Sequence, residues 1–186
     1  MRTVLCLGAA LMLLFGSAAR AQSGAETRAD IDALLNALKA APNEQTASLL
    51  EERLQRTWLR SGSAVTTLLM ARGLRSLKAE QYDDAIDCFS DAITLKPDFA
   101  EAFYQRGVAR YHAGDFAGAI ADFGATVRLE PRDFQAFRAL TEIAVSREDW
   151  KSAYEAWQKL LEIDPKTAGG QERLRELKQK AVGEEL

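Results

Sequence analysis

The tripeptides Leu95-Lys96-Pro97, Leu129-Glu130-Pro131 and Ile163-Asp164-Pro165 recur every 34 residues in this chain of 186 residues. Each leads from an aliphatic residue through one charged residue to a proline, which cannot continue an α-helix. A 34-residue period is typical of helical hairpins that stack, each packing on its neighbours. The tripeptides therefore predict an all-α fold in which three hairpins each end at a proline.

Residues of one type fill the same columns when three units are aligned from Thr66, Ala100 and Phe134. Two columns hold small residues, apart from one threonine: Gly73, Gly107 and Thr141; Ala85, Ala119 and Ala153. Three columns hold large apolar residues: Leu69, Phe103 and Phe137; Tyr82, Phe116 and Trp150; Phe89, Phe123 and Trp157. Small residues let two helices approach closely, and large apolar residues fill the space beside them. In the second unit, Gly114 is suited to a positive φ and Asp115 to capping the next helix, which predicts a turn there.

This combination of period, prolines and columns resembles the tetratricopeptide repeat family. The resemblance covers residues 66–165 and is best in the unit that runs from Ala100 to Pro131. It implies a right-handed α-solenoid within residues 63–170. Its three repeats are expected at residues 66–99, 100–133 and 134–167.

Helices are also predicted on both flanks of the repeats. In residues 22–62, apolar side chains recur at helical spacing on either side of Pro42: Ile31, Leu34, Leu35 and Leu38, then Leu50, Leu54 and Trp58. This pair is about one repeat long, so we predict a degenerate repeat or an N-terminal cap. Residues 171–186 are predicted to form a C-terminal capping helix and a frayed tail, because the end of a stack needs a polar cover.

The first 21 residues have the pattern of a secretory signal peptide. Arg2 precedes an apolar run, residues 4–15, that is too short to span a bilayer, and Ala19-Arg20-Ala21 fits a cleavage site. Cleavage near Ala21 removes two arginines and no acidic residue, which takes the formal net charge from −3 to −5. We therefore expect an exported bacterial protein, periplasmic or secreted, that meets the membrane only through its signal. An uncleaved N-terminal anchor is the alternative.

Few side chains in the mature chain are suited to catalysis or metal binding. His112 is the only histidine, and Cys88 is the only cysteine once Cys6 is lost with the signal. We interpret Cys88 as a structural thiol, and two such residues are too few for a zinc site. The acidic net charge and the absence of a basic run argue against nucleic acid. We therefore expect no enzyme, no cofactor, no metal and no small-molecule substrate.

Two arginines occupy the seventh column of the repeats. Arg106 can reach Asp122 across the second hairpin, and the third unit replaces both residues together, with Leu140 and Ala156. This paired loss predicts a structural ion pair rather than a binding arginine. Arg72 has no such partner, because a cysteine takes the column of Asp122 in the first unit, and its role stays open.

The resemblance implies that the first helices of the repeats line a concave groove through their second, fifth, ninth, twelfth and thirteenth columns. The predicted partner-binding residues are mostly apolar or aromatic, with charges in the third unit: Met70, Leu74, Leu77, Tyr104, Val108, Tyr111, His112, Arg138 and Glu142. Some family members hold a C-terminal carboxylate with lysine and asparagine in the fifth and ninth columns. Those residues are absent here, so we do not expect that mode. Either the groove is open, or helices within residues 28–60 cover its first apolar residues as core.

These observations predict an exported, non-catalytic adaptor or scaffold. In this hypothesis, the concave face of the solenoid binds a protein or peptide of the cell envelope. The alternative is a structural or assembly subunit that self-associates or docks through its convex face and terminal helices.

Overall fold

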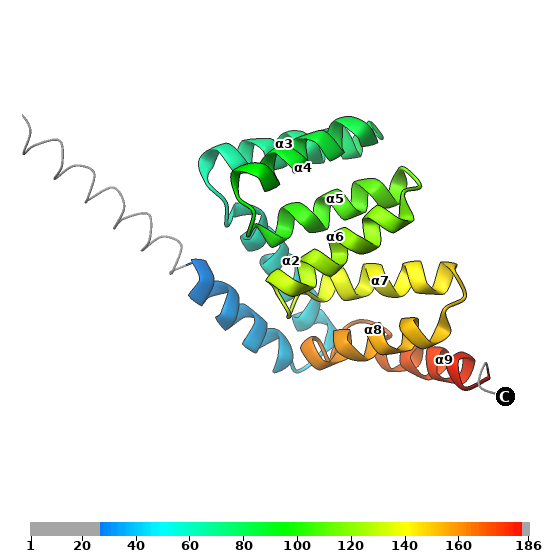
Figure 1. Ribbon diagram of the computed structural model, residues 1–186. Coiled ribbons are helices and arrows are strands. Elements are labelled where there is room, and N and C mark those ends of the chain that lie inside the picture. The colour runs from blue at the N-terminus through cyan, green and yellow to red at the C-terminus, as the bar shows by residue number, and fades with distance from the viewer. Residues whose placement is uncertain (1–26, 184–186) are drawn as a thin grey trace, which may run out of the picture.

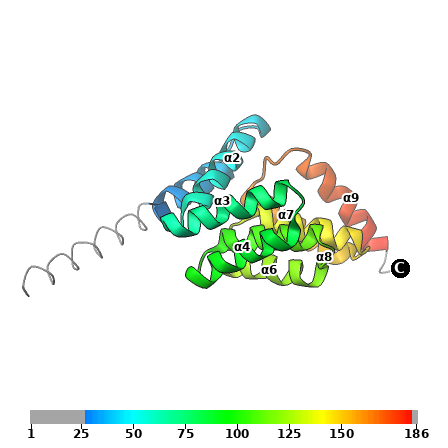
Figure 2. The same cartoon turned by 90° about the horizontal axis from the view of Figure 1, so that it is seen from above.

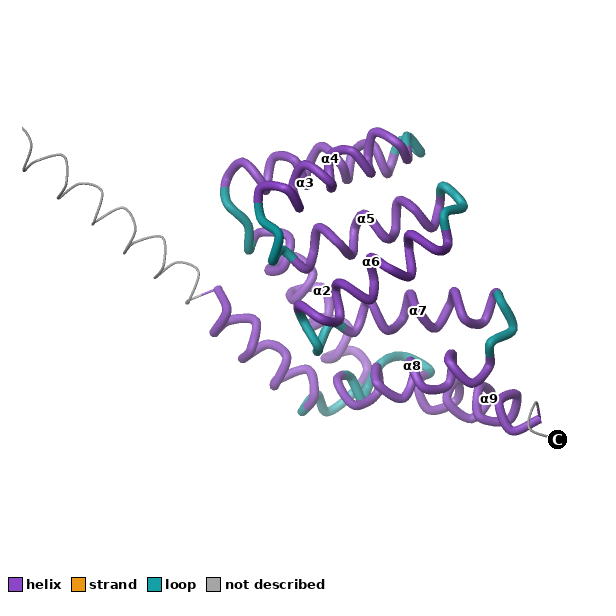
Figure 3. Tube along the Cα trace, in the orientation of Figure 1, coloured by secondary structure: helices purple, strands orange, loops and turns teal. Residues whose placement is uncertain are grey.

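A computed structural model describes residues 27–183, and the predicted signal peptide lies outside these residues. The described residues form helices joined by short loops, with no strand among them (Figures 1 and 3). The helices are a first one at residues 27–39, then α2 (Glu44–Arg60), α3 (Ala64–Lys78), α4 (Tyr82–Leu95), α5 (Ala100–His112), α6 (Phe116–Leu129), α7 (Phe134–Ser146), α8 (Trp150–Ile163) and α9 (Gly170–Gly183). Within residues 27–183, none of these helices combines the length and the apolar character that a membrane span requires.

Three helical hairpins, α3–α4, α5–α6 and α7–α8, stack side by side as the sequence predicts (Figure 1). The small columns are buried where the two helices of each hairpin meet: Ala85, Ala119 and Ala153 are fully buried. A Cβ atom placed on Gly107 would lie 2.8 Å from Cε1 of Phe123, so the aromatic ring occupies the space that a side chain would need. The expected all-α solenoid is confirmed.

The prolines act as the repeat pattern predicts. The second helices end at Leu95, Leu129 and Ile163, each two residues before a proline. The residue between takes an extended conformation, as proline demands of its predecessor, with φ between −143° and −124°. These loops lie along one edge of the stack (Figure 3).

The turn inside each hairpin uses a left-handed residue. Gly114 has a φ of 83°, and Asp115 accepts a hydrogen bond from the backbone N–H of Gly118, which confirms the predicted turn. Glu80 and Glu148 occupy the same column in the other two hairpins and have a φ of 59°. The strained glutamates were not expected from the sequence, because only the second unit has glycine there.

The N-terminal helix pair is present, but it does not stack on α3 in the way that one repeat stacks on the next. The first helix and α2 instead run across the hairpins, along the edge that carries the proline loops (Figures 1 and 2). Arg28 Nη1 lies 3.1 Å from Glu130 Oε2, and Asp32 pairs with Arg132. We call residues 27–60 the strap, since they tie successive repeats together.

One hydrophobic core joins the strap to the C-terminal end of the solenoid. Its buried members from the strap include Ile31, Leu34, Leu35, Leu38, Leu54 and Trp58, and those from the rest of the chain include Phe134, Trp157, Leu160 and Leu177. Leu177 comes from α9, which packs on α8. The Trp157 indole also donates to the carbonyl of Gly170, 2.8 Å away, and fixes the start of α9. The C-terminal helix therefore covers the last repeat as predicted.

Because the strap lies along the edge, the outer face of α3 has no covering helix. Leu68 is 71% exposed there, whereas Ala102 and Ala136 in the same column are fully buried between hairpins. Val65, one turn earlier on α3, is 58% exposed. The N-terminal end of the solenoid thus has two exposed aliphatic residues on α3.

Candidate functional site

The candidate site is the concave face, formed by α3, α5 and α7. In α3, Met70 is only 1% exposed and packs in the core with Phe89 and Phe99. Leu74 and Leu77 are half-buried against the same cluster, which also contacts Leu59 of the strap. Two of the three residues predicted in this helix therefore keep partly accessible side chains.

The predicted residues of α5 form an aromatic strip. Tyr104, Val108 and Tyr111 are half-buried against the core between the second and third hairpins. The Tyr111 ring meets His112 and Phe116 edge-on, with centroids 5.5 Å apart in both pairs. His112 is exposed. These contacts hold the rings in place and leave part of each surface accessible.

The two predicted charged residues of α7 both have intramolecular partners. Arg138 Nη2 lies 2.7 Å from Glu51 Oε1 of the strap and 2.9 Å from the hydroxyl of Thr167. The guanidinium of Arg138 also stands 5.4 Å from the centroid of the Phe134 ring. Glu142 lies 3.7 Å from Arg173 of α9. The strap and α9 therefore engage the charged part of the concave face.

Buried carboxyl groups lie close to the strap, and sequence reasoning missed them. Glu101, Asp133 and Asp164 are each at most 3% exposed. Burial, with a smaller contribution from the charge of Glu130, raises the pKa of Asp133 to about 7. Burial also raises the pKa of Glu101. The only sequence signal was position, since Asp133 caps α7 and Asp164 precedes a proline.

Asp164 and Glu51 form a pair of neighbouring carboxyl groups. Burial, a hydrogen bond with Glu51 and the charge of Glu51 raise the pKa of Asp164 to about 7. With both groups ionised, Asp164 Oδ2 has no donor. A proton on Asp164 supplies that donor, which agrees with the direction in which its pKa is shifted.

Buried polar atoms without a hydrogen-bond partner gather at the strap. Within residues 27–183, the buried side-chain atoms in this state are Trp58 Nε1, Glu101 Oε2, Gln135 Nε2 and Asp164 Oδ2. Trp58 and Glu101 line one cavity of about 310 Å³ between the strap and the repeats. Gln135 lies on α7 between Phe134 and Arg138, which both contact α2. The largely apolar contact between strap and solenoid thus also includes polar atoms without partners.

The groove is neither fully open nor covered in the way the sequence suggested. The strap covers the first half of α7 and part of the second column, where Arg138, Gln135 and Glu101 lie. Side chains in the ninth, twelfth and thirteenth columns, together with Tyr104 of the fifth, stay half-buried or exposed, including Leu74, Leu77, Val108, Tyr111 and His112. We call these two parts the covered half and the open half of the groove.

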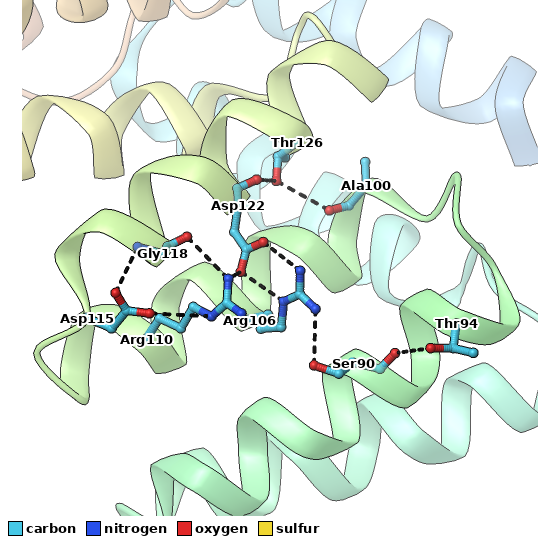
Figure 4. Close-up of polar contacts among 9 residues, drawn as sticks. All are labelled: Ser90, Thr94, Ala100, Arg106, Arg110, Asp115, Gly118, Asp122 and Thr126. Carbon is cyan, nitrogen blue, oxygen red and sulfur yellow. Dashed lines mark hydrogen bonds and ion pairs between the residues drawn. The ribbon is translucent and has the colours of Figure 1, made fainter.

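The predicted ion pair between α5 and α6 is confirmed. Arg106 makes two hydrogen bonds to Asp122, and Arg110 Nη1 lies 2.9 Å from the same carboxylate (Figure 4). In the third unit, Leu140, Ala144 and Ala156 stand at the three equivalent positions, and they line a hollow of about 680 Å³. Arg72 is exposed and makes no ion pair with any residue in 27–183.

Two further predictions concern cysteine and metals. Cys88 is buried and unpaired, in agreement with a structural thiol. No three histidine, cysteine or acidic side chains in the described part of the chain are grouped so as to hold a metal ion.

Comparison with known proteins places these helices in a family. The tetratricopeptide repeat model matches residues 70–125 and 113–168. A TPR repeat-containing protein of Rhizobium etli is 28% identical over 153 residues, which are 82% of this chain and 75% of that protein. The small glutamine-rich tetratricopeptide repeat-containing protein 2 of Mycosarcoma maydis is 31% identical over 97 residues, 52% of this chain and 28% of that protein.

Solved structures share the fold at low identity. The first TPR domain of Spaghetti (RPAP3), bound to the HSP90 peptide SRMEEVD, has a TM-score of 0.60 at 22% identity and covers 65% of this chain and 98% of its own. The Yersinia enterocolitica type III secretion chaperone SycD, in complex with a peptide of the translocator YopD, has a TM-score of 0.56 at 14% identity and covers 67% of this chain and 95% of its own. The family model matches more than half of the chain, along the hairpins described above. The chain belongs to the tetratricopeptide repeat family, whose domains are protein–protein interaction modules.

Proposed function

We propose that this protein is an exported, non-catalytic adaptor that binds a protein or peptide of the cell envelope in the open half of its concave groove. The observation that carries the proposal is the strip of half-buried Tyr104, Val108 and Tyr111, flanked by Leu74 and Leu77. Tyrosines held by neighbouring rings lose little entropy on binding, so they suit a partner interface. The structures of relatives that hold peptides support this class of function for the fold.

A cross-linking pull-down from the native envelope tests the proposal. The test variant is Tyr104→Ala with Tyr111→Ala, and the matched control is Val65→Ala with Leu68→Ala on the outer face of α3. We expect the first variant to lose a partner that the wild type and the control retain. Retention of every partner by the tyrosine variant, at matched folding, contradicts binding in the open half.

A second candidate function is assembly through the outer face of α3. Leu68 and Val65 are exposed at the place where a further hairpin would stack. A rise of mass with concentration in light scattering, abolished by Leu68→Glu, supports this candidate. A monomer at all concentrations contradicts self-association.

Export has a separate test. Mass spectrometry of the protein purified from its native host is expected to show a mature N-terminus near Gln22. A full-length chain that begins at Met1 and stays with the membrane fraction contradicts cleavage and supports an uncleaved anchor.

A further inference from the structure

The strap meets the covered half of the groove with one face of α2. Glu51, Leu54 and Trp58 are spaced by three and four residues and so lie on the same side of the helix. Leu54 is fully buried, Trp58 is buried, and the Glu51 side chain is 16% exposed. Glu52, by contrast, is exposed and pairs with Arg56 on α2 itself. The contacting face is thus an acidic residue followed by an aliphatic and an aromatic one.

The covered half is chemically complementary to this face. Arg138 Nη2 donates a hydrogen bond to the Glu51 carboxylate at 2.7 Å and another to the hydroxyl of Thr167. The Phe134 ring packs on the Trp58 indole with centroids 5.6 Å apart. Ion pairing fixes one point of the helix and aromatic packing fixes another. The surface therefore recognises a helix by its acidic and aromatic residues together.

The fit of α2 is nevertheless incomplete. The Trp58 indole N–H has no acceptor, and Gln135 Nε2 and Glu101 Oε2 also lack partners. Asp164 lies against Glu51, so the strap carboxylate meets a second carboxyl group as well as Arg138. A buried polar group without a partner loses its hydrogen bonds to water and gains none. A different helix that supplies hydrogen-bond partners to these atoms therefore binds this surface more favourably than α2 does.

We propose that the covered half of the groove is a binding site for an acidic amphipathic helix of a partner protein, with α2 as its intramolecular occupant. The partner helix carries a carboxylate, an aliphatic residue three positions later and an aromatic residue seven positions later, and it displaces α2. This inference rests on the proposed function, since it assigns the same concave face a partner class and a regulation. The apparent affinity for the partner is then the intrinsic affinity multiplied by the fraction of molecules in which the strap is open.

The test uses α2 as a probe in trans. A fluorescein-labelled peptide of residues 44–60 is titrated with the full chain, and binding is followed by fluorescence anisotropy. The full chain is used as wild type, as Glu51→Gln and as Glu52→Gln. The Glu52 variant is the matched control, because Glu52 is the next residue in the chain and its carboxylate pairs with Arg56 of α2 itself.

Weakening the intramolecular contact should favour the peptide. We expect Glu51→Gln in the full chain to tighten peptide binding about tenfold, the order expected from losing one charge-assisted hydrogen bond. Glu52→Gln should bind like the wild type. A peptide that itself carries Glu51→Gln should bind all three chains more weakly. Equal affinity for the Glu51 and Glu52 variants, or no loss with the altered peptide, overturns the proposal.

Hydrogen exchange shows whether the peptide takes the place of α2. Saturating peptide is expected to speed amide exchange in residues 44–60 of the full chain while leaving α4 unchanged. Binding with no change in α2 means that the peptide sits elsewhere, which overturns the proposal. A stable dimer that fails to bind the peptide also overturns the proposal. In such a dimer, the α2 helix of one copy occupies the groove of the other copy, and no site is left for a partner helix.

The outcome is separable from that of the proposed function. The peptide assay needs no native partner, and the envelope pull-down does not depend on Glu51. Failure in trans together with a tyrosine-dependent envelope partner removes this inference alone. Displacement of α2 without any tyrosine-dependent partner removes the open-half proposal alone.

Discussion

Arg106 and Asp122 face each other across the second hairpin as a two-point ion pair. Arg106 Nε lies 2.9 Å from Asp122 Oδ2, and Nη2 lies 2.8 Å from Oδ1 (Figure 4). Asp122 is only 4% exposed in its side chain, and it serves Arg110 as well. Arg106 also donates to Ser90 of the first hairpin, at 3.1 Å. One buried carboxylate therefore holds two arginines and links two repeats.

Removing that carboxylate should be costly. Asp122→Ala leaves the partly buried guanidinium of Arg106 without a counter-charge and Arg110 with Asp115 alone, and we expect a loss of about 3–5 kcal/mol in the free energy of unfolding. Glu162→Ala is the control, because Glu162 and Lys159 form an exposed pair whose loss should cost under about 1 kcal/mol. Urea denaturation measures both. Equal losses in the two variants would show that the buried Asp122 pair stabilises the fold no more than an exposed ion pair does.

Two helical glycines should respond in opposite ways to the same substitution. Gly107→Ala places a Cβ 2.8 Å from Phe123 Cε1 in a closed contact, so we expect destabilisation of about 1–3 kcal/mol. Gly124→Ala meets only Arg128 Nη1 at 3.6 Å, so the higher helix propensity of alanine should stabilise by up to about 1 kcal/mol. Thermal melting of the two variants measures both changes in stability. Stabilisation by both would mean that the Phe123 ring moves aside freely.

Glutamates with a left-handed backbone mark sites for stabilisation. Glu80→Gly and Glu148→Gly relieve a φ of 59°, and each should add about 1 kcal/mol. Glu80→Ala serves as the control, since it removes the carboxylate and keeps the strained φ. Gly114 has a φ of 83°, so Gly114→Ala is expected to lower the free energy of unfolding by a similar amount. A gain for Glu80→Ala as large as that for Glu80→Gly would assign the effect to charge rather than to the backbone.

The repeats were predictable because their information is local and recurs. Proline spacing fixes the end of each hairpin, and small and aromatic columns fix its packing. The Arg106–Asp122 pair was visible because the third unit loses both members together. Glu80 and Glu148 were missed for the complementary reason, since nothing in their residue type signals a positive φ.

The position of the strap could not be read in the same way. An amphipathic stripe shows which face of a helix is buried, but it does not show what covers that face. Glu51 and Arg138 are 87 residues apart, and no repeat column connects them. Asp133 and Asp164 look like ordinary solvent-exposed charges in the sequence. In the folded chain both are nevertheless buried.

The buried carboxyl of Asp133 should make stability depend on pH. Its pKa is raised from 3.8 to about 7, mainly by burial, so between these values the folded chain keeps a proton that the unfolded chain has lost. The free energy of unfolding therefore falls as the pH rises from about 4 to about 7, and Asp164 acts in the same direction.

Asp133→Asn should flatten this dependence. The amide oxygen can still accept the hydrogen bond from the Ala136 N–H that caps α7, and it stays neutral at every pH in the range. We expect the wild type to lose about 2 kcal/mol more than the variant between pH 5 and pH 8, measured by urea denaturation at several pH values.

Asp149→Asn is the matched control for this experiment. Asp149 caps α8 in the same way, by accepting a hydrogen bond from the Ser152 N–H, but it is exposed, and hydrogen bonds from the side chain and the N–H of Ser152 lower its pKa. The contribution of Asp149 to stability is lost only when the pH falls below the usual pKa of an aspartate. The change in the free energy of unfolding between pH 5 and pH 8 should therefore match that of the wild type. If Asp133→Asn and Asp149→Asn change the slope alike, the cap explains the effect. If neither changes it, the proton on Asp133 is not held by the folded chain.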